Sequence, residues 1–407
     1  MAFETLGNGV YYVVLLFALF IIPRLLQPFR IPTAITSFAL GAVSGIGLNR
    51  FQHDPTIELL STFGIVALFL FAGMEVEFAE LRRERRILFQ HVLIRVAALS
   101  LAAPLFLTVL DVDLRTGLLI ALAILTPSTG FILDSLGGLG LSSSEQFWIR
   151  SKAIATEIVA LVVLFGVIQS ESLPRLAVST GVLVGMIVLL PLAFRFFARI
   201  VVPFAPNSEF AFLIIMAVVC AMITRELGVY YLVGAFAVGI AAQHLRESLP
   251  SMSSEKMLHA VEAFGSIFVP FYFFHAGLLL RMSDLGIAQV IAGASMLLVF
   301  LALRLGLLAI HRGVAIREKL HETMRVGVPM LPTLVFTLVI VEILRERGEV
   351  PSYMLGGLIV YSIVNTLIPG LVMKSPPPEF EVLHPPPLTV KSEPESSGDH
   401  RTKSPLL

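Results

Sequence analysis

Two ionisable residues stand inside long apolar stretches, where a charge is costly. Glu157 lies nine residues after Trp148, and Arg304 lies eight residues before Arg312. At 1.5 Å per residue, each is roughly 12 to 13 Å from a helix end, near the middle of a hydrocarbon core about 30 Å thick. An acid at that depth costs about 2.5 to 3.5 kcal/mol and is by default a functional-site hypothesis. We therefore expect Glu157 and Arg304 to meet; the alternative is a buried ion pair that only holds helices together.

Proline interrupts two other apolar stretches, LLIALAILTPSTGFIL and MRVGVPMLPTLVFTLVIV. Each proline removes a backbone donor and frees carbonyl groups at membrane depth. A simple kink is one interpretation. Interrupted helices at corresponding positions of two halves are, however, the best sequence indication of a transport site built from inverted repeats. The residues at the two interruptions are Thr126, Pro127, Ser128 and Gly130, and Pro329, Pro332 and Thr333.

This set of residues predicts a site at which a proton and a monovalent metal cation, Na+ or K+, compete for the Glu157 carboxylate. Hydroxyl and freed carbonyl oxygens would complete the shell around the cation. Arginine does not deprotonate in a protein, so Arg304 would act as a buried counter-charge and not as a second proton carrier. One cation would then replace one proton, and the exchange would be electroneutral. The expected oxygen donors beside Glu157 are Thr126, Ser128, Thr156 and Thr333.

The elements that must position these residues are membrane helices. Of 407 residues, 56% are hydrophobic and only 14% are charged, against about 25% charged in soluble domains, so we exclude a soluble enzyme. The apolar runs are long and continuous, which predicts helices and not the alternating strands of a barrel. We expect an all-α polytopic protein of about thirteen transmembrane helices, in which spans 1 to 6 and 8 to 13 form two inverted repeats with crossed discontinuous helices. The spans are predicted to begin near residues 8, 32, 57, 89, 115, 148, 177, 208, 229, 257, 285, 320 and 352.

The distribution of basic residues predicts the orientation. Connections after the odd-numbered spans carry fifteen Lys and Arg, and the opposite connections carry seven. By the positive-inside rule, the N-terminus lies outside and the C-terminus in the cytoplasm, with the chain in the cell (inner) membrane. Residues 1–373 would form the exchanger domain in the lipid bilayer. Residues 374–407, with two Pro triplets, would form a disordered cytoplasmic tail.

Other features point to no further partner. The net charge of zero gives no electrostatic footprint for nucleic acid, and a single cysteine excludes a disulfide framework. No cofactor is expected. Arg95 is expected to snorkel to the interface, His275 to be a packing histidine, and Asn365 to join helices through hydrogen bonds.

Four segments resemble the monovalent cation:proton antiporter superfamily, which includes sodium/proton and potassium/proton exchangers. They are LFLFAGMEVEFAELRRERR, GVYYLVGAFAVGIAAQ, FGSIFVPFYFFHAGLLL and LALRLG, and the resemblance covers roughly residues 10 to 372. The ion-binding acid of that family, usually Asp preceded by Asn, Asp or Gln, falls on Glu157, which follows Thr156. Its buried basic residue falls on Arg304, and its crossed, unwound helices fall on the two proline breaks.

The resemblance implies a secondary active transporter that works as a homodimer, in which an ion-translocating core moves against a dimerisation scaffold. Two other classes of function stay open from the sequence. One is a gated monovalent cation channel or potassium efflux system of the same fold. The other is a membrane scaffold that does not transport.

Overall fold

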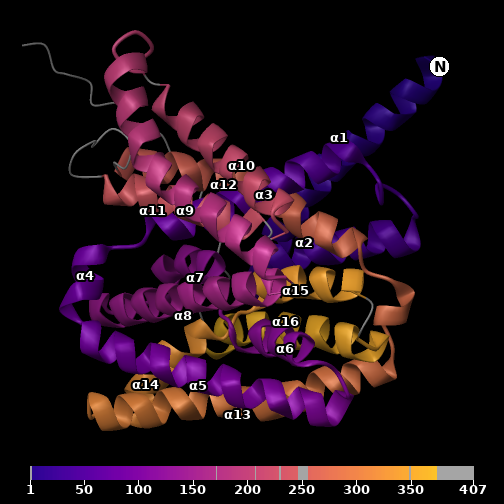
Figure 1. The fold of residues 1–407 in the computed structure, drawn as a ribbon. Helices are drawn as coiled ribbons and strands as arrows, with labels where there is room; N and C mark the ends of the chain where they lie inside the picture. The colour runs from indigo at the N-terminus through magenta and orange to yellow at the C-terminus, as the bar shows by residue number, and fades with distance from the viewer. Residues whose placement is uncertain are drawn as a thin grey trace, which may run out of the picture.

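The computed structural model describes residues 2–170, 172–206, 208–228, 231–245, 255–347 and 350–373, and every regular element in these ranges is a helix (Figure 1). The predicted disordered tail, 374–407, and with it the predicted domain boundary, lies outside the described residues. The first elements are α1 (Ala2–Leu26), η1 (Gln27–Phe29), α2 (Thr33–Ala42), η2 (Val43–Gly47), α3 (Pro55–Met74), α4 (Phe78–Arg83), α5 (Arg85–Leu110), α6 (Leu114–Leu125), α7 (Thr129–Ser135), η3 (Leu136–Leu139), α8 (Ser143–Gln169), α9 (Leu173–Phe196) and η4 (Phe197–Val201). The later elements are α10 (Glu209–Glu226), α11 (Tyr231–His244), α12 (Glu255–Leu278), η6 (Met282–Asp284), α13 (Ile287–Ala315), α14 (Leu320–Gly327), η7 (Val328–Met330), α15 (Leu334–Arg347) and α16 (Ser352–Val372).

Length and hydropathy identify the helices that can cross a membrane. In the described ranges, nine helices are long and apolar enough, and the bent pair 320–330 and 334–347 adds a tenth. Two shorter apolar segments, Thr33–Gly47 and Tyr231–His244, lie among them. A helix begins within a few residues of each predicted start. The total of thirteen membrane-spanning helices stays a prediction.

Polar residues in the connections start several of the long helices by accepting the first free backbone N–H groups. Asp54 Oδ1 accepts from the backbone N of Thr56 at 2.9 Å ahead of α3. Asp113 Oδ1 accepts from the backbone N of Thr116 at 2.8 Å ahead of α6. Partial burial raises the pKa of Asp113, but the hydrogen bonds that its ionised carboxylate accepts from Thr116 and Arg115 hold this pKa below its ordinary value.

The helices form two bundles. The first bundle contains α2, α3, α11 and α12, with α1 packed on α2 and α10 on α11. The second bundle contains α5, α6, α8 and α13 to α16. Figure 1 shows the first bundle in the upper half of the molecule and the second in the lower half. Helix α7 packs on both α3 and α8, and so lies where the two bundles meet.

Glycines allow the helices of the first bundle to approach closely. A Cβ atom on Gly73 of α3 would lie 2.4 Å from the backbone oxygen of Phe236 in α11, and one on Gly239 would lie 2.3 Å from the backbone oxygen of Leu70. Neither position can therefore carry a side chain at this helix spacing. Close approach at small residues is how helices gain packing energy in a bilayer, where apolar burial alone gives little.

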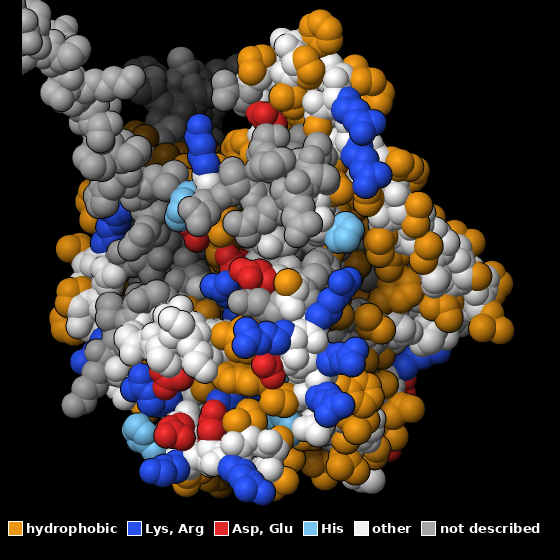
Figure 2. All heavy atoms as spheres, turned by 90° about the vertical axis from the view of Figure 1, so that its left-hand side faces the viewer, with side chains coloured by type: hydrophobic (Ala, Val, Ile, Leu, Met, Phe, Trp, Pro, Cys, Tyr) orange, Lys and Arg blue, Asp and Glu red, His pale blue; other side chains and the backbone are white. Residues whose placement is uncertain are grey.

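The surface divides into a charged end and apolar flanks. Figure 2 views the end of the molecule at which α4 lies and shows Lys and Arg side chains gathered there. Arg82, Arg83, Arg85 and Arg86 are all exposed. Apolar side chains of α1, α9 and α13 are exposed on the flanks, as expected of helices that face lipid. The predicted orientation places the charged end in the cytoplasm.

Candidate functional site

Both proline segments are breaks in helices, and the two breaks contact each other. Thr126, Pro127 and Ser128 separate α6 from α7, while Leu331 to Thr333 separate η7 from α15. The backbone N of Ser128 donates to the backbone oxygen of Pro332 at 2.8 Å, and the Ser128 Oγ accepts from the backbone N of Val335 at 3.0 Å. The break between α6 and α7 therefore contacts the break between η7 and α15 through both the backbone and the side chain of Ser128.

The carbonyl groups freed by the breaks find donors elsewhere in the fold. The backbone oxygen of Ala123 accepts from Thr337 Oγ1 at 2.7 Å, and that of Ile124 accepts from the Tyr361 hydroxyl at 2.9 Å. Both oxygens belong to the last turn of α6, which has no intrahelical donors for them. Irregular backbone at membrane depth is tolerated only where its polar groups are satisfied, and these contacts provide that.

Gly130 lets the break between α6 and α7 approach α3 of the first bundle. A Cβ atom at this position would lie 3.0 Å from the backbone oxygen of Leu68 in α3. Pro329 lies in η7, which directly continues α14, so its ring removes one backbone donor just before the second break. Pro332 supplies the carbonyl that Ser128 binds. Pro127, at the end of α6, is buried beside these residues.

Glu157 faces the crossing of the two breaks. Its side chain is 1% exposed, and its Oε2 atom has no hydrogen-bond partner in the described part of the chain. A cavity of about 10 Å³ lies against it, which is about the smallest that holds one water molecule. We call this cavity the Glu157 pocket; it is lined by Leu68, Phe69, Ser128, Thr129, Gly130, Phe131, Glu157, Val335 and Phe336.

A buried carboxylate without a partner is unfavourable in a low-dielectric interior. The pocket can therefore hold a proton on Glu157 or one small cation beside it. Ser128 and Thr129 place hydroxyl groups in its lining, and the Thr129 Oγ1 atom has no hydrogen-bond partner within the described ranges. Among described residues, no group of three or more His, Cys, Asp or Glu is placed to hold a metal ion.

The predicted meeting of Glu157 and Arg304 is wrong in this structure. Arg304 is 3% exposed, and its guanidinium donates to the backbone oxygens of Met330 at 2.7 Å and Leu331 at 3.0 Å. It also donates to the Tyr361 hydroxyl at 3.3 Å. Among the ion pairs of the described residues, none joins Glu157 to Arg304. The guanidinium instead satisfies the carbonyl end of the second broken helix, where a positive charge is favoured.

Arg304 and Tyr361 together join the two breaks. Tyr361 accepts from Arg304, which holds the second break, and donates to Ile124 in the first. Sequence reasoning missed Tyr361, although a tyrosine inside an apolar span needs a hydrogen-bond partner and could have been noted for that reason. Arg304 therefore holds the two breaks together, and within the described ranges no basic side chain is paired with Glu157 as we had expected.

Thr156 does not reach the Glu157 pocket. Its hydroxyl donates to the backbone oxygen of Lys152 at 2.8 Å and lies 3.0 Å from His91 Nε2. Successive residues of a helix point about 100° apart, so Thr156 and its neighbour face different helices. Thr126 and Thr333 are buried at the breaks but do not line the pocket, although Thr333 Oγ1 has no hydrogen-bond partner among described residues. Of the predicted hydroxyl donors, only Ser128 lines it, and Thr129 was missed.

Basic side chains are buried between α5, α8 and α13. Lys152 is 0% exposed, and its Nζ atom lies 3.3 Å from His311 Nδ1 and 5.7 Å from the centre of the Trp148 ring. Arg95 is 5% exposed, so the expectation that it snorkels to the interface is wrong. Sequence reasoning counted Lys152 among the connection charges, because it lies near the start of a helix that is apolar beyond it.

Three comparisons with known proteins agree with one another. The sequence model of a family described as "Sodium/hydrogen exchanger, transmembrane" matches residues 14–376. The chain is 24% identical over 386 residues to the probable Na(+)/H(+) antiporter 3 of Methanocaldococcus jannaschii, which covers 90% of this chain and 96% of that protein. It is 26% identical over 294 residues to the Na(+)/H(+) antiporter NhaS5 of Synechocystis, which covers 67% of this chain and 39% of that longer protein.

The fold is similar to that of a solved antiporter structure. The sodium proton antiporter MjNhaP1 from Methanocaldococcus jannaschii at pH 8 superposes with a TM-score of 0.66 at 14% sequence identity. The match covers 91% of this chain and 96% of that chain. At this identity the likeness establishes the fold alone.

Proposed function

The chain belongs to the transmembrane sodium/hydrogen exchanger family, and we propose that it exchanges a monovalent cation, Na+ or K+, for H+ across the membrane. The observation that carries this proposal is Glu157. Its carboxyl group is buried beside a cavity large enough for one water-sized particle, at the crossing of two broken helices. Relatives whose names describe Na(+)/H(+) antiport support the same class of transport.

Exchange follows from competition at a single carboxyl group. In a pocket of low dielectric, Glu157 is stable when it carries a proton or when a cation lies beside it, and unstable when it is charged and alone. Loading a cation therefore requires the loss of the proton. The Ser128 and Thr129 hydroxyls line the space in which the cation would lie. A buried arginine keeps its proton, and Arg304 donates to two carbonyl groups, so the exchange is one for one and electroneutral.

Movement of one bundle against the other would expose the site to each side in turn. The Glu157 pocket takes Leu68 and Phe69 from the first bundle, and Glu157, Val335 and Phe336 from the second. A displacement between the bundles therefore opens or closes it without breaking either bundle. In this proposal the first bundle is the scaffold of a homodimer, and the second bundle carries the ion. The protein is a multi-pass membrane protein, which we place in the inner membrane with its N-terminus outside.

The test compares the wild-type protein with Glu157→Gln in everted membrane vesicles. An imposed proton gradient is reported by a dye, and Na+ or K+ is then added. We expect the wild type to collapse the gradient and Glu157→Gln to leave it intact, because an amide cannot exchange a proton for a cation. Glu262→Gln is the matched control, since Glu262 pairs with His259 on a partly exposed face of α12 and should exchange normally. Equal collapse by wild type and Glu157→Gln would remove Glu157 from the mechanism.

Electroneutrality needs a separate measurement. In proteoliposomes, the membrane potential is set with valinomycin and a potassium gradient, and the rate of Na+-driven proton movement is measured at several potentials. A rate that is independent of potential supports one-for-one exchange. A rate that rises or falls steadily with potential would contradict it. A cation flux without coupled proton movement would instead favour a channel.

A further inference from the structure

Two adjoining cavities open at the end of the molecule where α3 begins and where α12 and α15 end. Their volumes are about 460 and 380 Å³. Both are lined by Tyr272, His275, Glu342 and Glu346, so we treat them as one vestibule. The vestibule lies between the bundles, because Tyr272 and His275 belong to α12 of the first bundle and the two acids belong to α15 of the second.

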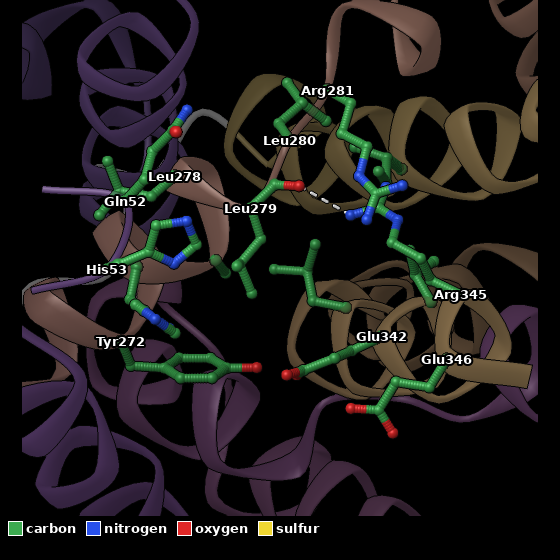
Figure 3. Close-up of a pocket in the computed structure, with 15 residues that line it drawn as sticks. Gln52, His53, Tyr272, Leu278, Leu279, Leu280, Arg281, Glu342, Arg345 and Glu346 are labelled. Atoms are coloured by element: carbon green, nitrogen blue, oxygen red, sulfur yellow. Dashed lines mark hydrogen bonds between the residues drawn. The ribbon is translucent and has the colours of Figure 1, made fainter. Parts of the chain in front are cut away.

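The lining of the vestibule includes both exposed and buried residues. His53, Glu58 and Glu346 are exposed, whereas Tyr272 is only 7% exposed. In Figure 3 the Tyr272 hydroxyl and the Glu342 carboxylate point toward one another across the cavity. Tyr272 is therefore one of the buried residues that an ion in the vestibule can reach.

The same two helices, α3 and α15, line both the vestibule and the Glu157 pocket, and we call the residues between the two spaces the wall. On α3, Ile65 lines the vestibule and Leu68 lines the pocket, a separation of three residues or about 4.5 Å along the helix. On α15, Leu338 lines the vestibule and Phe336 lines the pocket, which is about 3 Å. On either bundle, residues that line the two spaces therefore lie within one helical turn of each other along the helix axis.

Tyr272 lies at this wall. Its hydroxyl donates to the backbone oxygen of Val335 at 3.4 Å, and Val335 lines the Glu157 pocket. The backbone N of Val335 donates in turn to the Ser128 hydroxyl, which lines the same pocket. The contact from Tyr272 to Val335 joins α12 to α15 and so crosses the interface between the bundles. It is long for a hydrogen bond between two oxygens, and a small displacement would break it.

We propose that Tyr272 is the gate between the vestibule and the Glu157 pocket, closed by its ring and held by its hydrogen bond to Val335. Movement between the bundles separates the hydroxyl from Val335 and lets a cation or a proton pass. This inference rests on the exchange function proposed above. It adds a residue that does not contact the ion at Glu157 but controls the access of that ion from the vestibule.

The test measures access to a cysteine on each side of the wall. The native cysteine, Cys220, is buried and is first replaced in a Cys220→Ala background. Leu68→Cys then reports on the pocket, and Ile65→Cys, three residues away on the same helix, reports on the vestibule. Silver ion, a monovalent cation that reacts with thiols, is added to membrane vesicles from the side on which Ile65→Cys reacts. The thiols left unreacted are counted with a fluorescent maleimide after denaturation.

We expect Ile65→Cys to react rapidly and Leu68→Cys slowly while Tyr272 is present. Tyr272→Phe should speed the Leu68→Cys reaction about fivefold, as the loss of one neutral hydrogen bond predicts. Tyr272→Ala should speed it by about tenfold or more, because the wall loses its ring. An unchanged Ile65→Cys rate in both variants shows that the bundles still pack normally.

Two results would overturn the proposal. One is a Leu68→Cys reaction as fast as that of Ile65→Cys with Tyr272 in place, and the other is a Leu68→Cys rate that stays unchanged in Tyr272→Ala. Exchange by the wild-type protein is measured separately. If the wild-type protein exchanges ions but Tyr272 variants do not change the Leu68→Cys rate, the gate is refuted and the proposed function stands. If Tyr272 variants change the Leu68→Cys rate but the wild-type protein does not exchange ions, the proposed function is refuted and the gate stands.

Discussion

Replacing Tyr361 by Phe should weaken the crossing of the broken helices without changing the shape of the core. The ring stays, but the hydroxyl that donates to the backbone oxygen of Ile124 at 2.9 Å and accepts from Arg304 at 3.3 Å is lost. The Ile124 oxygen lies in the last turn of α6 and then has no donor, and an unsatisfied buried acceptor costs about 1 to 3 kcal/mol. Arg304 keeps its hydrogen bonds to the backbone oxygens of Met330 and Leu331, so losing its bond to Tyr361 costs less free energy than leaving the Ile124 oxygen without a donor.

We therefore expect Tyr361→Phe to lower the free energy of unfolding by roughly 2 to 3 kcal/mol. The measurement is reversible denaturant unfolding in mixed micelles, followed by tryptophan fluorescence from Trp148. Tyr353→Phe is the matched control on the same helix, because Tyr353 is 40% exposed and its loss should change stability by less than about 0.5 kcal/mol. If both variants lose the same small amount, the hydroxyl does not hold the crossing, and the account of Arg304 and Tyr361 as its brace fails.

Three further predictions concern stability and use the same unfolding assay. Gly73→Ala should destabilise the protein by about 1 to 3 kcal/mol because its Cβ would collide with the α11 backbone, whereas Gly166→Ala, which has open space in α8, should be neutral or stabilising; destabilisation of both would contradict the packing argument. Lys152→Met should raise stability by about 1 kcal/mol or more, because it removes a buried positive charge among other basic groups, and the exposed Lys319→Met should change little; a loss of stability in Lys152→Met alone would show that its bond to His311 matters more. Asp113→Ala should cost about 1 kcal/mol at neutral pH as the cap of α6 is lost. Since the pKa of Asp113 is lowered by folding, the wild type should lose this contribution as pH falls below the ordinary aspartate value of about 4, while Asp113→Asn should keep a cap that does not respond to pH; equal pH dependence of the two would be the contrary result.

The sequence alone determined the membrane class, the positions of the helices and the two breaks. In lipid every backbone polar group must be satisfied within the protein, so an apolar run of about 20 residues predicts a helix, and a proline inside it predicts freed carbonyls. The helices begin near the predicted residues, and the two breaks lie at Thr126 to Ser128 and Leu331 to Thr333. Glu157 was found by the same reasoning, because an acid in the middle of an apolar run is rare whatever surrounds it.

Only the tertiary structure decided which neighbouring helix each buried side chain faces. Depth in the membrane follows from counting residues, and Glu157 and Arg304 do have similar predicted depths, but each further residue turns the side chain by about 100°. In a helix that is apolar on all sides, hydropathy does not distinguish the face toward lipid from the face toward protein. The partners of Arg304, the different direction of Thr156 and the burial of Arg95 and Lys152 all depend on that rotation, which is set by contacts between helices far apart in the chain.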